Sequence, residues 1–206
     1  MAPRATSLAW VEDLAEEVIS PRPCAQQFPD LETRVAEHDR LVEAGSAHGL
    51  RHCGYHTLNT LRIEKAYREW AHDMGPTDTL VEAGLAFTCA WDKPGGFIGR
   101  EALLAQREAG TPKRRLVQFL LDDPEPMLAH NEPILRDGEP AGYTLSSGYA
   151  HTLGACAAMG YLSSEEGVTR EFVEAGSYRI EQANRVYGAR ASLAPMYDPA
   201  NERTRG

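Results

Sequence analysis

The spacing of apolar residues predicts two helices at the start of the chain. Residues 8–19 place their apolar side chains on one stripe, with Ser7 as an N-cap. Three prolines within residues 20–29 then end regular structure, so this stretch is interpreted as a linker. A second helix is predicted from Asp30, because apolar positions recur at helical spacing up to Gly45, and glycine commonly closes helices.

The next part of the chain alternates between helical and other signals. A third helix is predicted from about Tyr55, and Pro76 is its latest possible end, since the run IEKAYREW already favours an irregular segment. Residues 86–91 have the aromatic and β-forming content of a strand. Residues 100–108 return to helical composition, and the Gly-Thr-Pro of residues 110–112 then marks a boundary between two units.

Beyond that boundary the pattern changes to short strands separated by Gly, Asp and Asn. Asp137-Gly138 lies between two of these strands and is a strong signal for a hairpin turn. Several short, closely spaced strands are typical of a small barrel or sandwich. The predicted strands are RRLVQFLL, EPILR, AGYTLSS, ACAAMGYL, SYRIEQA and VYGARASL.

Length and charge exclude several classes of protein. The 206 residues suit one domain or two small ones. With 30 acidic and 21 basic side chains the net charge is -9, which disfavours a non-specific nucleic-acid binder, because neutralising phosphates needs an excess of basic residues. No apolar run approaches the length that would span a membrane, so no membrane association is expected.

The cysteines and histidines favour neither a metal site nor a disulfide framework. No two cysteines form a CxxC pair and no histidines form an HExxH pair, so we expect no bound metal. A reducing compartment is the simpler interpretation. The first residues contain four acids by Glu17 and no long apolar core, so a cytoplasmic location is expected, or the mitochondrial matrix in a eukaryote. The cysteines are Cys24, Cys53, Cys89 and Cys156.

Residues 54–103 concentrate charge, aromatic surface and glycine in one stretch. LRIEKAYREWAHDM, LVEAGLAFTC and FIGREAL resemble the folate-binding region of the aminomethyltransferase family, as it recurs in sarcosine and dimethylglycine dehydrogenases. The resemblance continues through KRRLVQFLLDD, EPILRDGEPAGYTLSSGY and YGARASLAPMYDPANERTRG. It therefore runs from about Leu41 to the end, and YDPANERTRG looks most like sarcosine dehydrogenase.

This resemblance implies an α+β fold with a folate-binding part and a barrel. We expect residues 1–29 to be a leader and linker without a family counterpart. Residues 30–111 then correspond to the latter part of the aminomethyltransferase folate-binding domain. Residues 112–206 correspond to the small antiparallel β-barrel domain that follows it in the family.

The resemblance also implies a folate site. Tetrahydrofolate has a flat hydrogen-bonding pterin, an aromatic linker and an anionic tail, so its site needs a carboxylate, ring surfaces and cations. Each candidate also has a structural alternative, because charged residues two apart on a helix pair elsewhere, rings pack, and cations are usually solvated. The candidates are the charged pair Arg62 and Glu64, the rings Tyr67 and Phe87, and the tail-side cations Lys93 and Arg114.

The implied function is that of a folate-binding module in a sarcosine or dimethylglycine dehydrogenase-like enzyme. Tetrahydrofolate would accept the one-carbon unit, and FAD would be held by a missing domain or a flavin-containing partner chain, since the GxGxxG loop of flavin domains does not occur here. The family's catalytic aspartate loop has no counterpart before Leu41, so catalytic residues are unknown. The alternative is a truncated, non-catalytic binding or assembly protein, with oligomers forming through its exposed half-domain surface.

Overall fold

The computed structural model describes residues 31–205, so the helix predicted over residues 8–19 and the linker over residues 20–29 lie outside the described residues. The chain forms two compact units that divide after Gly54. In the first unit, α2 (Leu31–Ser46) confirms the second predicted helix. Gly45 lies in its last turn, where an added Cβ would come within 2.5 Å of Leu50 Cδ1. The glycine therefore permits the chain to fold back on itself where the helix ends.

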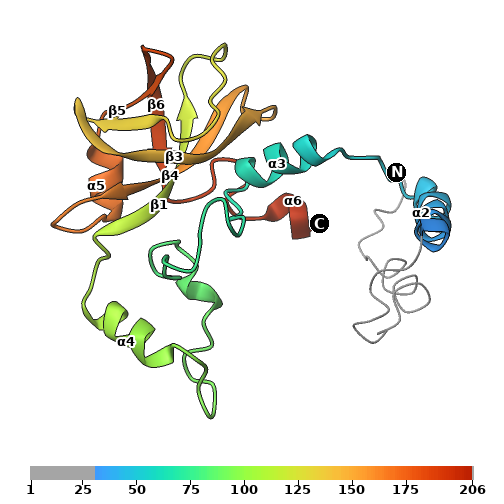
Figure 1. The fold of residues 1–206 in the computed structure, drawn as a ribbon, viewed down its shortest axis with the longest axis horizontal. Coiled ribbons are helices and arrows are strands. Elements are labelled where there is room, and N and C mark those ends of the chain that lie inside the picture. Colours follow the sequence, from blue (N-terminus) through green and yellow to red (C-terminus); the bar gives the residue numbers. More distant parts are fainter. Residues whose placement is uncertain (1–30, 206) are drawn as a thin grey trace. The chain divides into compact units, whose positions relative to one another are not determined.

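The second unit contains a closed barrel of six antiparallel strands, which confirms the predicted barrel and the α+β class (Figure 1). Around the barrel the strands follow the order β1-β4-β3-β2-β5-β6, and each hydrogen bonds to both neighbours. Closure leaves no unpaired edge strand. The elements are β1 (Arg114–Leu121), β2 (Pro133–Arg136), β3 (Glu139–Ala150), β4 (Ala155–Ser163), β5 (Tyr178–Gln182) and β6 (Arg185–Ser192), with α5 (Arg170–Ala175) before β5.

Two tight turns set the register of the barrel hairpins. Asp137 and Gly138 join β2 to β3 with φ values of 53° and 92°, as the sequence predicted for this pair. Ala183 and Asn184 join β5 to β6 with φ values of 50° and 61°. Two successive residues with positive φ match the right-handed twist of paired strands, which is why such turns favour hairpins.

β1 is buried on both faces. Its residues Val117, Phe119 and Leu121 face the barrel interior, where they pack with side chains from the other strands. The alternate residues Leu116 and Leu120 face outward and belong to a second apolar cluster. Because successive side chains of a strand point to opposite faces, burial of both sets requires another element to cover the outside of the barrel.

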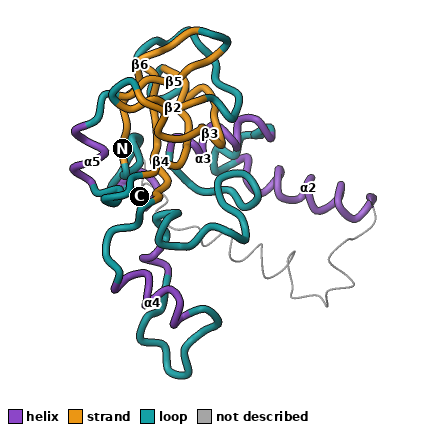
Figure 2. Tube along the Cα trace, turned by 60° about the vertical axis from the view of Figure 1, so that its left-hand side comes forward, coloured by secondary structure: helices purple, strands orange, loops and turns teal. Residues whose placement is uncertain are grey.

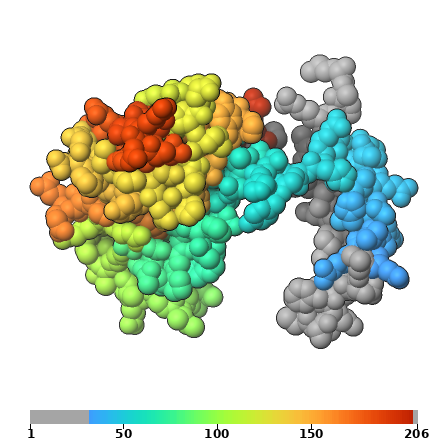
Figure 3. Space-filling view, turned by 45° about the horizontal axis from the view of Figure 1, so that its top comes forward, coloured from blue at the N-terminus to red at the C-terminus, as the bar shows by residue number. Residues whose placement is uncertain are grey.

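That covering element is α3 (Tyr55–Glu64), which begins at the predicted residue. Ile63, fully buried on α3, packs in the outer cluster with Leu116 and Leu120. The helix lies close to β3 at Gly148, where an added Cβ would be 3.2 Å from Thr60. In the space-filling view the teal segment that begins with α3 lies directly against the strands (Figure 3).

The chain between α3 and β1 is mostly irregular. The strand predicted over residues 86–91 is wrong, because this stretch contains the short 3-10 helix η2 (Ala86–Thr88) and forms no strand ladder. Its amide of Cys89 bonds locally to the carbonyl of Ala86, and Phe87 is 81% exposed. β-forming residues without a neighbouring strand to pair with do not make a strand. The predicted helix α4 (Arg100–Glu108) is confirmed and lies outside the barrel wall (Figure 2).

The C-terminal segment returns to the end of α3. Asp198, in a left-handed conformation with φ of 45°, accepts a hydrogen bond from the amide of Glu202 at 2.9 Å. It therefore caps the short helix α6 (Glu202–Arg205). This agrees with the turn anchor that the sequence indicated at Asp-Pro and Asn201.

We expect Gly160→Ala to destabilise the barrel by about 3 kcal/mol, because the added methyl group overpacks β4. An added Cβ would lie 2.4 Å from the carbonyl oxygen of Tyr143 and 2.7 Å from Ile134 Cδ1. Chemical denaturation measures the free energy of unfolding. Gly54→Ala is the matched control, since its Cβ would meet nothing within 4 Å. Equal free energies of unfolding for the two variants would contradict the close packing at Gly160.

Candidate functional site

The last turn of α3 places Arg62 within a cluster of polar groups. Its guanidinium lies 2.6 Å from Asp73 Oδ2, 2.8 Å from Glu69 Oε2 and 2.9 Å from the hydroxyl of Ser146. It also donates to the carbonyl oxygen of Tyr67 at 3.2 Å. The Arg62 side chain is 13% exposed, so its charge is balanced mainly by these protein groups.

Asp73 is the fully buried partner in this cluster. Its Oδ2 also accepts a hydrogen bond from the amide of Glu69 at 2.8 Å, while its Oδ1 has no partner. The Nε of Arg62 is likewise buried and unpartnered. Buried polar atoms without partners usually bind water or a ligand in the working protein. The site therefore retains unused hydrogen-bonding capacity beside the ion pair.

A groove of about 350 Å³ lies next to Arg62. One wall is α3 and the other is the segment that follows it, which ends at Trp70. Two aromatic rings at the groove are largely exposed, Tyr55 by 70% and Trp70 by 61%. Concave sites of this size with ring surfaces and a few polar groups are typical of small-ligand sites. The lining residues are Tyr55, Leu58, Asn59, Arg62, Arg68, Glu69 and Trp70.

Glu64 takes a different direction from Arg62. It is only 2% exposed, and its Oε1 accepts a hydrogen bond at 2.7 Å from the amide of Thr152, in the turn between β3 and β4. The structure therefore agrees with the expectation that the two charged residues do not face each other. Each makes its contacts with a different part of the fold.

Arg114 belongs to a second polar cluster, at the start of β1. Its guanidinium lies 2.5 Å from Asp78 Oδ1 and 3.6 Å from the centre of the Tyr161 ring. Burial alone would raise the pKa of Asp78, but hydrogen bonds from Arg114 and the Gly75 amide outweigh it, so the pKa lies below its usual value. Burial, with the nearby Asp78 carboxylate, raises the pKa of Tyr161 to about 12.

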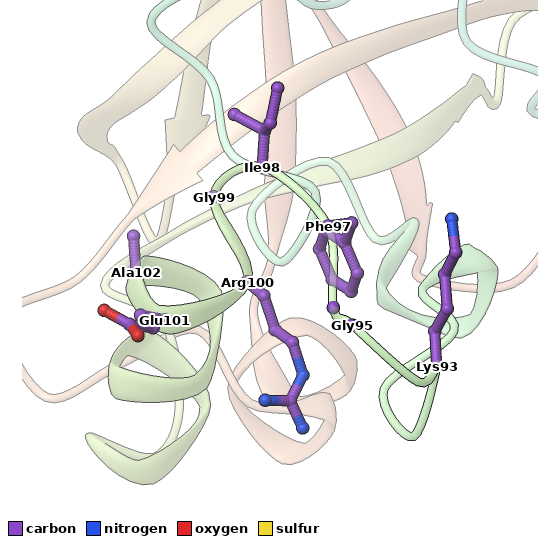
Figure 4. A pocket seen from close by; sticks show the side chains of 9 residues that line it. Lys93, Gly95, Phe97, Ile98, Gly99, Arg100, Glu101 and Ala102 are labelled. Carbon is purple, nitrogen blue, oxygen red and sulfur yellow. The ribbon is translucent and has the colours of Figure 1, made fainter.

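The remaining candidates lie on the surface. Tyr67 is 52% exposed and Phe87 81% exposed. Lys93 lines a separate hollow of about 910 Å³ together with residues 95–102. In Figure 4 its ammonium group and the guanidinium of Arg100 point in opposite directions, so these two cations do not converge on one point.

The structure thus brings only some of the predicted residues together. Arg62 lines the groove, while Lys93 lines another hollow and Arg114 is paired with Asp78. Sequence reasoning did not assign Asp73 or Tyr161 to the site. An acidic residue in AHDMG was the only signal for Asp73, and nothing in ACAAMGYL distinguished Tyr161 from a packing residue.

Neither a metal-binding cluster nor a membrane-spanning helix occurs within residues 31–205. Within this range, no three or more His, Cys, Asp or Glu side chains gather in a way that could hold a metal ion. Among the helices of the same range, none has the length and apolar character needed to cross a membrane.

We expect Asp73→Asn to destabilise the protein by about 3 kcal/mol, because it leaves the buried Arg62 with incomplete charge compensation. Denaturant unfolding at neutral pH gives the measurement. The control is Glu165→Gln, which breaks an exposed pair with Lys113 at 2.6 Å and should leave the unfolding midpoint almost unchanged. A midpoint equally insensitive to both changes would show that the Arg62 cluster does not support the fold.

The lowered pKa of Asp78 predicts an acid-sensitive contribution to stability. Its contribution is present above the unfolded-state pKa of about 3.9 and is lost as the pH falls through the folded-state pKa. The difference in unfolding free energy between wild type and Asp78→Asn should therefore shrink below about pH 4. Unfolding curves between neutral and acidic pH test this, with exposed Asp92→Asn as control. A difference that stays constant with pH would refute the assignment.

Comparison with known proteins identifies both parts of the chain. Residues 30–93 match the model of the GCVT N-terminal domain, and residues 114–198 match that of the glycine cleavage T-protein C-terminal barrel domain. The aminomethyltransferase T of the glycine cleavage system from Bartonella henselae has a similar fold, with a TM-score of 0.65 at 19% identity. That similarity covers 80% of this chain and 45% of the solved one.

Curated relatives are larger proteins. Mitochondrial sarcosine dehydrogenase of Homo sapiens is 38% identical over 98% of this chain and 21% of its own length. The 4-methylaminobutanoate oxidase (formaldehyde-forming) of Paenarthrobacter nicotinovorans is 39% identical over 87% of this chain and 21% of its own length. The chain thus spans about a fifth of these relatives. Both domain models match in order, and the chain belongs to the glycine cleavage T-protein, or aminomethyltransferase, family.

Proposed function

We propose that this chain is the tetrahydrofolate-binding module of a sarcosine or dimethylglycine dehydrogenase-like enzyme of N-methyl amine breakdown. The observation that carries the proposal is the ordered match to both T-protein domains. In addition, 98% of this chain is similar to sarcosine dehydrogenase. In this proposal tetrahydrofolate accepts the one-carbon unit that oxidation of the amine releases.

The described residues fit such a ligand. The groove offers the exposed rings of Tyr55 and Trp70 and the guanidinium of Arg62, which suit a flat group with a hydrogen-bonding edge. A carboxylate is the group that best accepts hydrogen bonds from a pterin amide and amino group. Glu69 places one in the groove lining, and Glu64, which does not line the groove, is the second carboxylate at the end of α3. Its contact with Thr152 fixes the direction of that carboxylate.

We assign separate roles to the candidate residues. Arg62 and Glu64 orient the pterin end, and Tyr67 adds ring surface beside them. Phe87 is assigned as a further ring surface. Lys93 and Arg114 belong to the tail side, where cations attract the carboxylates of the folate tail. Lys93 is exposed and lines its own hollow, while Arg114 is half-buried and paired with Asp78. These separate positions suit a long, partly solvated tail better than a ring that must be held rigidly.

The module would act by positioning. Holding the amine of the folate near the one-carbon unit replaces an encounter between two free molecules. FAD belongs, in this proposal, to another domain or to a flavin-containing partner chain. The name of one relative describes it as formaldehyde-forming, and formaldehyde is the product expected when the one-carbon unit is not captured. The same module would work in the mitochondrial matrix or in a bacterial cytoplasm.

A second candidate function is a non-catalytic binding or assembly role. Exposed apolar side chains on the α3 face favour it, because such patches often mark protein interfaces. On α3 these are Tyr55, Leu58 and Leu61, and the exposed ring of Trp70 lies on the segment that follows. A folded protein that forms stable oligomers and does not bind folate would favour this candidate over the first.

Calorimetric titration with tetrahydrofolate, under anaerobic and reducing conditions, tests the leading proposal. We expect saturable binding that weakens at least about tenfold in Glu64→Gln, because the amide loses the charge-assisted hydrogen bonds but can still accept from Thr152. Glu139→Gln, on the exposed start of β3, is the control and should bind as wild type does. No binding to folded wild-type protein would refute the proposal.

A further inference from the structure

Gln118 occupies an unusual place in the middle of β1. It lies on the outer face of the barrel between Leu116 and Leu120, within the apolar cluster under α3, and is 3% exposed. Its side-chain amide donates to the carbonyl oxygens of Ile63 at 2.7 Å and Glu64 at 3.2 Å. A buried polar side chain among apolar neighbours is tolerated only when such bonds satisfy it.

These two carbonyls belong to the last turn of α3. The last carbonyls of a helix have no partner within the helix and need one from elsewhere. The Ile63 carbonyl accepts from the Ala66 amide at 2.9 Å. Gln118, a side chain from a strand 54 and 55 positions further along the chain, is its second donor and the donor to Glu64. Gln118 is therefore a C-terminal cap that the barrel supplies to α3.

The same side chain also holds the C-terminal segment. Gln118 Oε1 accepts a hydrogen bond from the amide of Met196 at 2.7 Å. Two positions further on, Asp198 receives the ammonium group of Lys65, whose Nζ lies 2.6 Å from the Asp198 carbonyl oxygen and 3.1 Å from Oδ2. Both side chains of this ion pair are 8% exposed.

Contacts from β1 and from the C-terminal segment thus hold the end of α3. Gln118 bonds to residues 63 and 64, and Asp198 bonds to residue 65, immediately after them. Arg62 and Glu64, which we assign to the ligand, lie in or next to the turn that these contacts hold. Gln118 itself is not among the residues that line the groove.

We propose that Gln118 is a positioning residue for the folate site and that it couples the C-terminal segment, residues 194–201, to the last turn of α3. The ligand in this proposal rests on the proposed function, whereas the coupling does not. Without the cap, the turn is ordered for only part of the time. The apparent affinity for a ligand falls by the fraction of molecules that are competent to bind it.

Two substitutions separate capping from simple packing. Gln118→Met fills a similar volume but removes all three hydrogen bonds at every pH. Gln118→Glu keeps an acceptor for Met196, but its ionised carboxylate can only repel the carbonyls of Ile63 and Glu64. When protonated, the introduced carboxyl again has one donor and restores part of the cap. Gln182→Glu, on β5, is the matched control.

Hydrogen exchange of the Ala66 and Met196 amides provides the first readout. In wild type these amides bond to the Ile63 carbonyl and to Gln118 Oε1. At neutral pH we expect the Ala66 amide to exchange about tenfold faster, relative to wild type, in both Gln118 variants. The Met196 amide should lose its protection from exchange only in Gln118→Met, because Gln118→Glu keeps an acceptor for it.

The pH dependence then distinguishes the two variants. Burial beside carbonyl oxygens raises the pKa of the introduced carboxyl, so the Gln118→Glu variant loses stability relative to wild type as pH rises above about 4.3, and Gln118→Met does not. Glu64, Lys65 and Asp198 are the charged groups that adjoin position 118, and all variants share them. The paired strand residues Met159 and Ser192 do not titrate in this range.

Titration with tetrahydrofolate at a temperature where each variant is folded gives the second readout. We expect about tenfold weaker binding in both Gln118 variants and wild-type binding in Gln182→Glu. Unchanged exchange at Ala66 and Met196 would overturn the coupling, and unchanged affinity in both variants would overturn the positioning role. If wild type itself fails to bind, the proposed function and the positioning role fail together, while the exchange data still decide the coupling.

Discussion

Burial of β1 on both faces is the constraint on which the rest of the structure depends. A closed barrel fills its own interior, but Leu116 and Leu120 point outward and need a second apolar surface. α3 supplies that surface through Ile63, which is fully buried against them. The position of α3 is therefore fixed by packing against the barrel, and its polar side chains are presented from a rigid support.

This packing has an electrostatic consequence at the end of α3. The turn that buries Ile63 also brings Arg62 and Glu64 into poorly solvated positions, where each must find partners. Arg62 finds Asp73 and Glu69 on the following segment, and Glu64 finds the amide of Thr152. The same groups that satisfy these charges also fix their directions, which is what a binding site requires.

The end of α3 lies in the part of the chain that matches the family. The charged turn of α3 lies within residues 30–93, which match the GCVT N-terminal domain, and sarcosine dehydrogenase of Homo sapiens is similar over 98% of this chain. In the function proposed above, the module contributes to the reaction by holding a ligand in place. Its contacts with the barrel and with the C-terminal segment are then part of the site, although these residues do not line the groove.

The sequence by itself determined the elements whose signals are local. The barrel strands follow from short apolar runs between turn residues, and the turn at residues 137–138 follows from an Asp-Gly pair, which readily adopts positive φ. The start of α3 follows from helical spacing. Each of these signals depends only on neighbours in the chain. Only the tertiary structure decided that residues 86–91 form no strand and that Arg62 contacts Ser146, 84 positions away. Such contacts depend on which distant surfaces are buried together, and no local pattern records that information.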